Sequence, residues 1–134
     1  YEQGGLVVSD RYTTSNAVHQ ASKEPEEKRK DFLKWLYELE YDHMGLPRPD
    51  LVLYLDVPTD FTEMLLRSRE AATGTHADIH EADTQYLSAS RRMGRSAAEY
   101  YGWTLISCVK NGKMRSIQDI HEEIYRYVTK CLEE

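Results

Sequence analysis

The sequence predicts an α/β fold, in which strands and helices alternate along the chain around a parallel sheet. The 134 residues are enough for one domain with its own apolar core. Short apolar runs alternate with longer amphipathic segments in the order strand, helix, strand, helix, helix, strand, helix. The clearest run, Leu51–Leu55, is continuously apolar, which is typical of a strand covered on both faces. We therefore expect a single domain over residues 1–134.

The first part of the chain predicts one strand and one long helix. Leu6–Val8 is a short, mainly β-branched run that follows two glycines, and it predicts a buried strand. Residues 13–25 are small and polar, and they indicate a loop or a broken helical turn. From about Ser22 a helix is expected, and the glycine and prolines at 45–49 end it. Its apolar face holds Phe32, Leu33, Leu36 and Leu39, with Glu40 and His43 along a polar edge.

The middle of the chain predicts two helices after the strand at 51–55. Thr59 is a candidate N-cap for a helix that runs to about Arg69. Residues 70–78 are expected to form a flexible loop, after which Asp78 and Glu81 have the spacing of a capping box. A long helix follows, and its apolar stripe is formed by Tyr86, Ala89, Met93, Ala97 and Tyr100.

The last part of the chain predicts a strand, a turn and a helix. The strand covers 103–108 and the turn covers 111–113. Ser116 is the expected N-cap of the final helix. The apolar face of that helix holds Ile117, Ile120, Ile124, Tyr127 and Cys131.

Composition excludes several classes of protein. The 17 basic and 23 acidic residues give a formal net charge of -6 without a basic stripe, which disfavours a nucleic-acid partner. Cys108 and Cys131 lie far apart and form neither a disulfide framework nor a zinc motif, which is typical of a reducing compartment and favours a cytoplasmic location. No apolar stretch is long enough to span a membrane, so we expect no membrane partner.

The first candidate site follows the strand at Leu6–Val8. Ligands of open α/β sheets bind beyond the carboxyl ends of the strands, and Asp10 and Arg11 stand at that position. The carboxylate could hold a hydrated metal, and the guanidinium fork matches a phosphate group. The alternative is a turn with a surface salt bridge, and the pattern alone favours neither. Uncharged hydrogen-bonding groups suited to a base and a sugar follow at Ser15, Asn16, His19 and Gln20.

The second candidate site is the segment from 67 to 81. Arg67 and Arg69 end a helix before a loop that contains glycine, and such loops often close over phosphoryl groups. The pattern by itself favours a solvated helix end, where arginines complement the helix dipole. The i, i+4 pair His76 and His80 lacks a clear third metal ligand, so an exposed pair is the favoured interpretation. The chain contains no phosphate-binding motif of the form G-x-x-x-x-G-K-[ST].

Three ordered motifs resemble the thymidylate kinase family. Leu6–Ala17 resembles its strand and D-R-Y-x-x-S signature, and Gly45–Val57 resembles its G-L-x-x-P-D-L-x-x-x-L-x-V segment. Asp78 and Glu81 stand where the lid of that family, here about 70–81, runs into its long helix. The resemblance covers nearly the whole chain. It implies a P-loop kinase fold, a five-stranded parallel sheet flanked by helices, in an enzyme that is usually a homodimer.

The resemblance implies transfer of the γ-phosphoryl group of ATP to dTMP with Mg²⁺, which gives dTDP for dTTP synthesis. Asp10 would then stand near the metal, and Arg11 would hold the dTMP phosphate. Ser15 and Asn16 would face the thymine, with His19 and Gln20 along the nucleoside pocket. The lid would bring Asp78 and Glu81 to the nucleotide, and its nearest cations are Arg67 and Arg69.

The chain departs from that family at its beginning. The family's P-loop and first strand precede the D-R-Y strand, so the chain corresponds to the C-terminal part of such a domain. The sheet would then have two unpaired edges. We expect the 134 residues alone to be inactive, and either poorly folded or completed by another polypeptide. The lid also lacks an arginine between Ala71 and Glu81. Two alternatives are a related nucleoside or nucleotide kinase with another acceptor and a non-catalytic nucleotide-binding relative.

Overall fold

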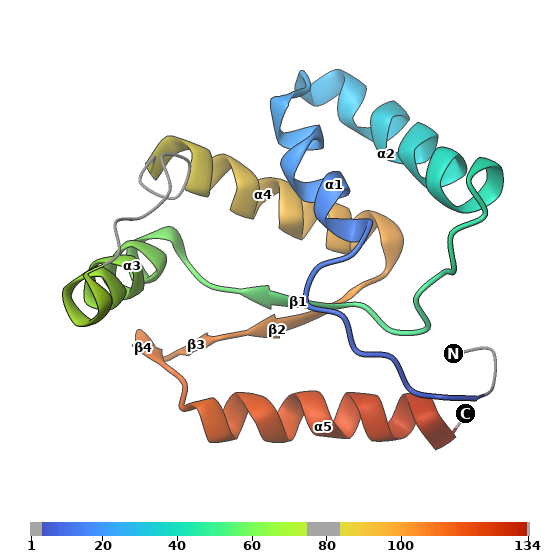
Figure 1. Cartoon of the computed structure of the whole chain (residues 1–134). Helices are drawn as coiled ribbons and strands as arrows, with labels where there is room; N and C mark the ends of the chain where they lie inside the picture. The colour runs from blue at the N-terminus through green and yellow to red at the C-terminus, as the bar shows by residue number, and fades with distance from the viewer. Residues whose placement is uncertain (1–3, 75–83, 134) are drawn as a thin grey trace. The chain divides into compact units, whose positions relative to one another are not determined.

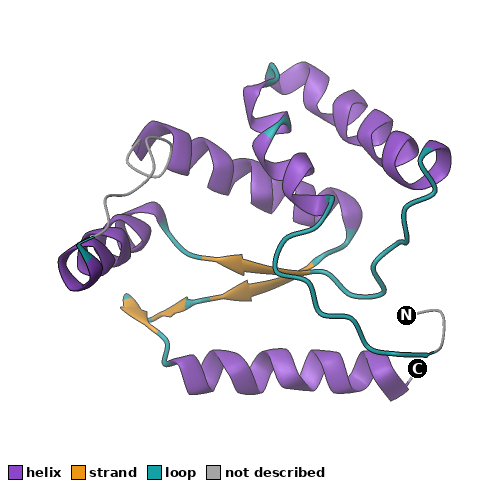
Figure 2. Ribbon diagram, in the orientation of Figure 1, coloured by secondary structure: helices purple, strands orange, loops and turns teal. Residues whose placement is uncertain are grey.

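The computed structural model describes residues 4–74 and 84–133, which divide into two compact units at residues 1–46 and 47–134 (Figure 1). Each unit is described by itself. The first is built from short helical segments, and the second contains all the strands of the described residues (Figure 2).

The first unit is helical around a small apolar core. Its elements are α1 (Thr14–His19), the 3₁₀ turns η1 (Ala21–Lys23) and η2 (Glu26–Lys28), α2 (Arg29–Tyr37) and the π-helix η3 (Glu38–His43). The core is formed by Ala17, Ala21, Leu33 and Leu36. The expected apolar face of the helix is therefore confirmed at Leu33 and Leu36.

The strand predicted at Leu6–Val8 is wrong. These residues form no strand, and Leu6, Val7 and Val8 are exposed by 63%, 67% and 84%. A strand needs a neighbour that completes its hydrogen bonds, and within the described residues Leu6–Val8 belongs to neither sheet. The β-branched run therefore lacks the pairing that a strand requires within the described residues.

The helix predicted from Ser22 is interrupted near its start. Pro25 lacks a backbone N–H and restricts the residue before it, so the chain forms two separate 3₁₀ turns before α2 begins at Arg29. The polar segment expected between 13 and 25 also contains a complete short helix, α1. The end near Gly45 is confirmed, where the backbone adopts a positive φ of 66°.

The second unit is an α/β arrangement with a small parallel sheet. Its elements are β1 (Leu53–Asp56), α3 (Thr59–Thr73), α4 (Thr84–Tyr101), β2 (Thr104–Ser107), β3 (Val109–Lys110), β4 (Lys113–Met114) and α5 (Ile117–Glu133). β1 pairs with β2 in parallel, in a register that sets Leu53 against Thr104 and Asp56 against Ser107. β3 and β4 form an antiparallel hairpin over the predicted turn. The prediction of an α/β class with a parallel sheet is thus confirmed within this unit.

The helix ends of this unit follow the sequence in part. Thr59 is not an N-cap, because α3 begins at Thr59 itself with Pro58 before it, and the helix continues past Arg69 to Thr73. Gly74 then ends it with a φ of 66°. Ser116 does cap α5, because its Oγ accepts a hydrogen bond from the Asp119 backbone N–H at 3.1 Å.

The core of the second unit lies between α4 and the parallel strands. Its buried apolar side chains are Met93, Ala97, Ala98, Ile106 and Cys108. The stripe predicted on α4 is buried at Met93 and Ala97, whereas Tyr100 at its end is 43% exposed. α5 contacts β2, yet none of its described side chains is fully buried. None of the described helices is both long and apolar enough to cross a membrane.

Candidate functional site

Asp10 and Arg11 lie on the surface just before α1. Both are exposed, and Arg11 adopts a positive φ of 65°, which side chains other than glycine rarely take. The Ser9 hydroxyl donates a hydrogen bond to the Arg11 carbonyl at 2.6 Å and holds this turn in place. Such backbone strain is often found at functional sites, where it directs a side chain. The turn therefore presents a carboxylate and a guanidinium side by side in the sequence at the start of a helix.

The four uncharged candidates follow on α1 and just beyond its end. Ser15 and Asn16 are held by backbone hydrogen bonds to Tyr12 and Thr13, at 3.0 and 2.9 Å. Asn16 and His19 are three residues apart and share a helix face. Gln20 follows the last residue of the helix, where its Oε1 accepts a long hydrogen bond of 3.4 Å from the Lys23 Nζ. The structure thus gathers these candidates on one short helix of the first unit and the residue that follows it.

His19 is electrostatically coupled to Arg11. Partial burial lowers the pKa of His19 below its usual value, and the positive charges of Arg11 and Lys23 lower it further. The imidazole is therefore neutral near pH 7, and it offers one donor and one acceptor rather than a charge. A neutral ring suits a nucleoside contact better than a phosphate contact.

Two residues of the π-helix η3 reach α1, and sequence reasoning missed both contacts. Asn16 Nδ2 donates to Glu40 Oε1 at 2.9 Å, and Glu40 is buried. The hydroxyl groups of Thr13 and Tyr41 lie 2.6 Å apart in a hydrogen bond. The one available signal was the polar Glu40 on the edge of an apolar helix face. In a regular α-helix, consecutive residues such as 40 and 41 point in different directions, so helical periodicity does not predict that both contact the same segment.

The lid candidates are only partly described. Arg67 and Arg69 are exposed within α3, and because they are two residues apart they point to different sides of the helix. The sequence predicted that the helix ends at these arginines, but α3 continues to Thr73. Asp78 and Glu81 lie outside the described residues, as do His76 and His80. The roles expected of the lid residues therefore stay predictions.

A cluster of ion pairs around the buried Asp56, at the carboxyl end of β1, was not predicted. Arg91 donates to both oxygens of Asp56, with Nε to Oδ1 at 2.7 Å and Nη2 to Oδ2 at 3.0 Å, and Arg95 Nη1 donates to Oδ2 at 2.5 Å. Burial alone would raise the pKa of Asp56, but the hydrogen bonds and charges of the two arginines outweigh it and hold the pKa below its usual range. The i, i+4 spacing of the arginines on α4 was the signal that could have identified it.

The donor set near Asp10 suits one kind of metal. No group of three or more histidine, cysteine or acidic side chains converges within the described residues, so they offer no cage of the kind that structural zinc needs. Magnesium commonly binds one or two carboxylates, several waters and substrate phosphates. A single exposed carboxylate such as Asp10 therefore fits Mg²⁺ that arrives with a phosphorylated ligand.

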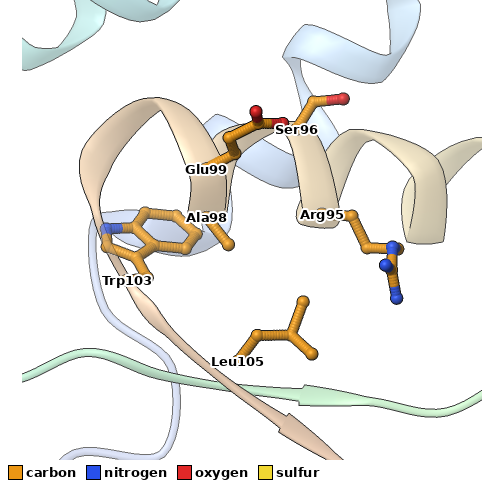
Figure 3. A pocket seen from close by; sticks show the side chains of 6 residues that line it. All are labelled: Arg95, Ser96, Ala98, Glu99, Trp103 and Leu105. Carbon is orange, nitrogen blue, oxygen red and sulfur yellow. The ribbon is translucent and has the colours of Figure 1, made fainter.

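A pocket of about 420 Å³ lies between α4 and the beginning of β2 (Figure 3). Figure 3 shows the ring of Trp103 on one side of it, Arg95 on the other side and Leu105 below. Its remaining lining residues are Ser96, Ala98 and Glu99. Ligands of α/β sheets bind beyond the carboxyl ends of the strands, whereas this pocket lies at the amino end of β2, and we assign it no role.

The chain is distantly similar to thymidylate kinases. It is 30% identical over 101 residues to the thymidylate kinase of Mycobacterium tuberculosis, from strain CDC 1551 / Oshkosh and equally from strain ATCC 25618 / H37Rv. The matched region covers 73% of this chain and 46% of each relative, so the chain spans about half the length of the curated relatives it matches. No family model matches the sequence. No solved structure matches it either.

Proposed function

We propose that the protein is a thymidylate-kinase-like phosphotransferase and that the first unit binds the acceptor nucleotide. The observation that carries the proposal is the strained, exposed turn of Asp10 and Arg11, followed at once by Asn16 and His19 on one helix face. The distant similarity to thymidylate kinases supports the same assignment. A phosphate group, a metal and a nucleoside could each find a chemically suitable partner there.

The candidate residues of the turn and of α1 have separate roles in the proposal. The Arg11 guanidinium holds the phosphate of dTMP through charged hydrogen bonds. Ser15 and Asn16 face the thymine, and the neutral His19 lines the nucleoside pocket together with Gln20. Positioning and charge stabilisation dominate phosphoryl transfer, so groups that fix the acceptor contribute directly to the rate.

Asp10 would hold the magnesium ion, which neutralises charge on the reacting phosphates when it is bound. Arg67 and Arg69 would supply further positive charge, and Asp78 and Glu81 would approach the nucleotide. The ATP-binding loop is not among these residues. We propose that a preceding segment supplies it and pairs with the exposed Leu6–Val8 run. The homodimer expected from the resemblance stays a prediction.

The test is a phosphotransfer assay on the full-length protein with ATP, Mg²⁺ and dTMP. We expect dTDP to form, and we expect Arg11→Ala to lower kcat/KM for dTMP by about 100-fold, since a charged hydrogen bond contributes about 1.5–3 kcal/mol. Arg126→Ala is the matched control, because Arg126 is an exposed arginine on α5 outside the proposed site. Equal activity of the two variants would contradict the assignment of Arg11.

A second candidate is a related kinase with another pyrimidine acceptor. The observation that favours it is the place of His19 on the face of α1 that carries Asn16, since an imidazole can donate or accept toward sugars or bases of several kinds. Parallel assays with dUMP and with deoxynucleosides separate the two candidates. Failure to phosphorylate any of them would favour the non-catalytic nucleotide-binding alternative.

A further inference from the structure

The buried Glu40 carboxylate faces an uncharged amide. Glu40 is 7% exposed, and its Oε1 accepts one hydrogen bond from Asn16 Nδ2 at 2.9 Å. Among the residues that the structure describes, no lysine or arginine forms an ion pair with it. Burying a carboxylate opposite a neutral partner is unfavourable for stability. Glu40 is therefore a poor stabilising element, and a role for it has to be sought in what it does to Asn16.

The backbone of η3 determines how Glu40 approaches α1. Glu40 and Tyr41 are consecutive residues of the π-helix η3, and both contact the beginning of α1. The hydroxyl groups of Tyr41 and Thr13 lie 2.6 Å apart in a hydrogen bond, and Thr13 is three residues before Asn16. Short π-helical segments are uncommon and occur frequently at functional sites. The hydrogen bond from Asn16 Nδ2 sets the Glu40 carboxylate against the side chain of Asn16, and the contact of Tyr41 with Thr13 lies beside it.

This contact determines which end of the Asn16 amide points outward. A carboxylate can only accept hydrogen bonds, so the NH₂ group of Asn16 has to face Glu40. Its Oδ1 then points away as an acceptor. Within the described part of the chain, no group donates to that oxygen, and the Asn16 side chain is exposed. The site therefore offers an oriented acceptor on α1, on the face it shares with His19.

We infer that Glu40 is a positioning residue that fixes the amide of Asn16 and so selects the base of the acceptor nucleotide. This inference rests on the proposed function. Thymine and uracil carry an N–H group at N3, which an oriented amide oxygen can accept. Cytosine has an unprotonated N3 at that position and leaves the oxygen unpaired, which is costly in a desolvated site. Glu40 acts through Asn16 and selects bases with an imide N–H.

The test compares dTMP with dCMP as acceptors for the full-length protein and for Glu40→Gln. The glutamine has nearly the same shape, but its amide can donate as well as accept, so it no longer dictates the orientation of Asn16. We expect the ratio of kcat/KM for dTMP to that for dCMP to fall about tenfold, which corresponds to one hydrogen bond. The KM for dTMP should rise more than kcat falls, and Tm should stay unchanged or increase.

Two variants separate positioning from a general structural effect. Tyr41→Phe removes the neighbouring contact to Thr13 and should leave the selectivity ratio unchanged. In the background of Asn16→Ala, Glu40→Gln should cause no further loss of selectivity, because the residue through which it acts is gone. If Glu40→Gln does not unfold cooperatively, Glu40→Asp, which withdraws the carboxylate by one methylene, should lower the ratio in the same direction.

The outcomes distinguish the inference from the proposed function. Wild-type activity with a ratio that Glu40→Gln leaves unchanged, or that Tyr41→Phe lowers equally, overturns the positioning role alone. Absence of wild-type activity toward any pyrimidine nucleotide overturns the proposed function and the inference together. An additive loss in the double variant shows that Glu40 acts on the base without Asn16, and it overturns the stated route.

Discussion

Asp56 and Glu40 are both buried carboxylates, but the groups that surround them differ. Asp56 receives three hydrogen bonds from two guanidinium groups of α4, whereas Glu40 receives one from the neutral amide of Asn16. Arginines compensate the charge of Asp56 and join β1 to α4. Glu40 has no such compensation among the described residues, and its one contact orients a side chain of the candidate site. The comparison indicates that Asp56 belongs to the scaffold and Glu40 to the function.

The largest expected effect is that of Asp56→Asn on stability. Loss of the charge leaves Arg91 and Arg95 facing a neutral amide, and breaking a buried ion pair typically costs 3–5 kcal/mol. Both arginines keep contact with solvent, so we expect about 3 kcal/mol, at the low end of that range. The free energy of unfolding in urea, with the exposed Asp50→Asn as control, measures it. A loss no greater than that of the control would contradict the scaffold role.

Wild type and Asp56→Asn should also differ in how their stability depends on pH. The pKa of Asp56 is lower in the folded protein than in the unfolded chain, so its stabilisation is fully present above the unfolded value of about 3.9. It is lost as the pH falls through the folded pKa. The stability difference between wild type and Asp56→Asn should therefore shrink as the pH falls below about 4. A difference that stays constant as the pH falls well below about 4 would show that the charge of Asp56 is not involved.

A smaller loss of stability is expected from Gly94→Ala. A methyl group at Gly94 would overlap the ring of Tyr54 on β1, so the helix that carries Arg91 and Arg95 would have to move away from Asp56. Overpacking of this kind costs about 1–3 kcal/mol. Thermal unfolding measures the effect, and Ser96→Ala, at an exposed position of the same helix, is the control. Unchanged stability of Gly94→Ala would show that Tyr54 can leave its place without cost.

Glu40→Gln should have little effect on stability or increase it slightly. The substitution removes a buried carboxylate that has no cationic partner among the described residues, and we expect the free energy of unfolding to stay unchanged or to rise by up to about 1 kcal/mol. Urea unfolding of this variant beside Asp56→Asn tests the comparison directly. A loss as large as that of Asp56→Asn would place Glu40 in the scaffold and remove the contrast between the two carboxylates.

The smallest expected effect is a change in the titration of His19. Burial and then the charge of Arg11 lower the pKa of His19, so Arg11→Ala should raise that pKa part of the way toward its usual value. The resonances of the imidazole, followed by NMR as the pH is varied, report it. Lys23→Ala should cause a smaller rise, because Lys23 contributes least. An equal pKa of His19 in wild type and Arg11→Ala would contradict an electrostatic interaction between Arg11 and His19.

The sequence predicted correctly the secondary-structure elements that neighbouring residues determine. The continuous run at 51–55, the cap at Ser116 and the glycine at 45 led to β1, α5 and the end of the first helical region. The strand at Leu6–Val8 failed because a strand depends on a neighbour that the apolar run does not itself supply. Thr59 failed as a cap because Pro58 takes the position before the helix.

The candidate site was only partly accessible to sequence reasoning. Asp10, Arg11, Asn16 and His19 are close in the sequence, so a short turn and the helix that follows it bring them together whatever the rest of the chain does. Glu40 is distant in the sequence and reaches Asn16 only because the helix widens into a π-helix at Glu38. The Asp56 cluster likewise joins a strand to a helix 35 residues later. Contacts of this kind depend on tertiary packing, which periodicity does not report.

Calorimetric titration of the full-length protein with dTMP tests the central claim most directly. The account predicts that wild type binds dTMP and that Arg11→Ala weakens the binding by about 100-fold, while Arg126→Ala binds as wild type does. Absence of dTMP binding by wild type, or equal binding by the two arginine variants, would contradict the assignment of an acceptor-nucleotide site to the turn of Asp10 and Arg11.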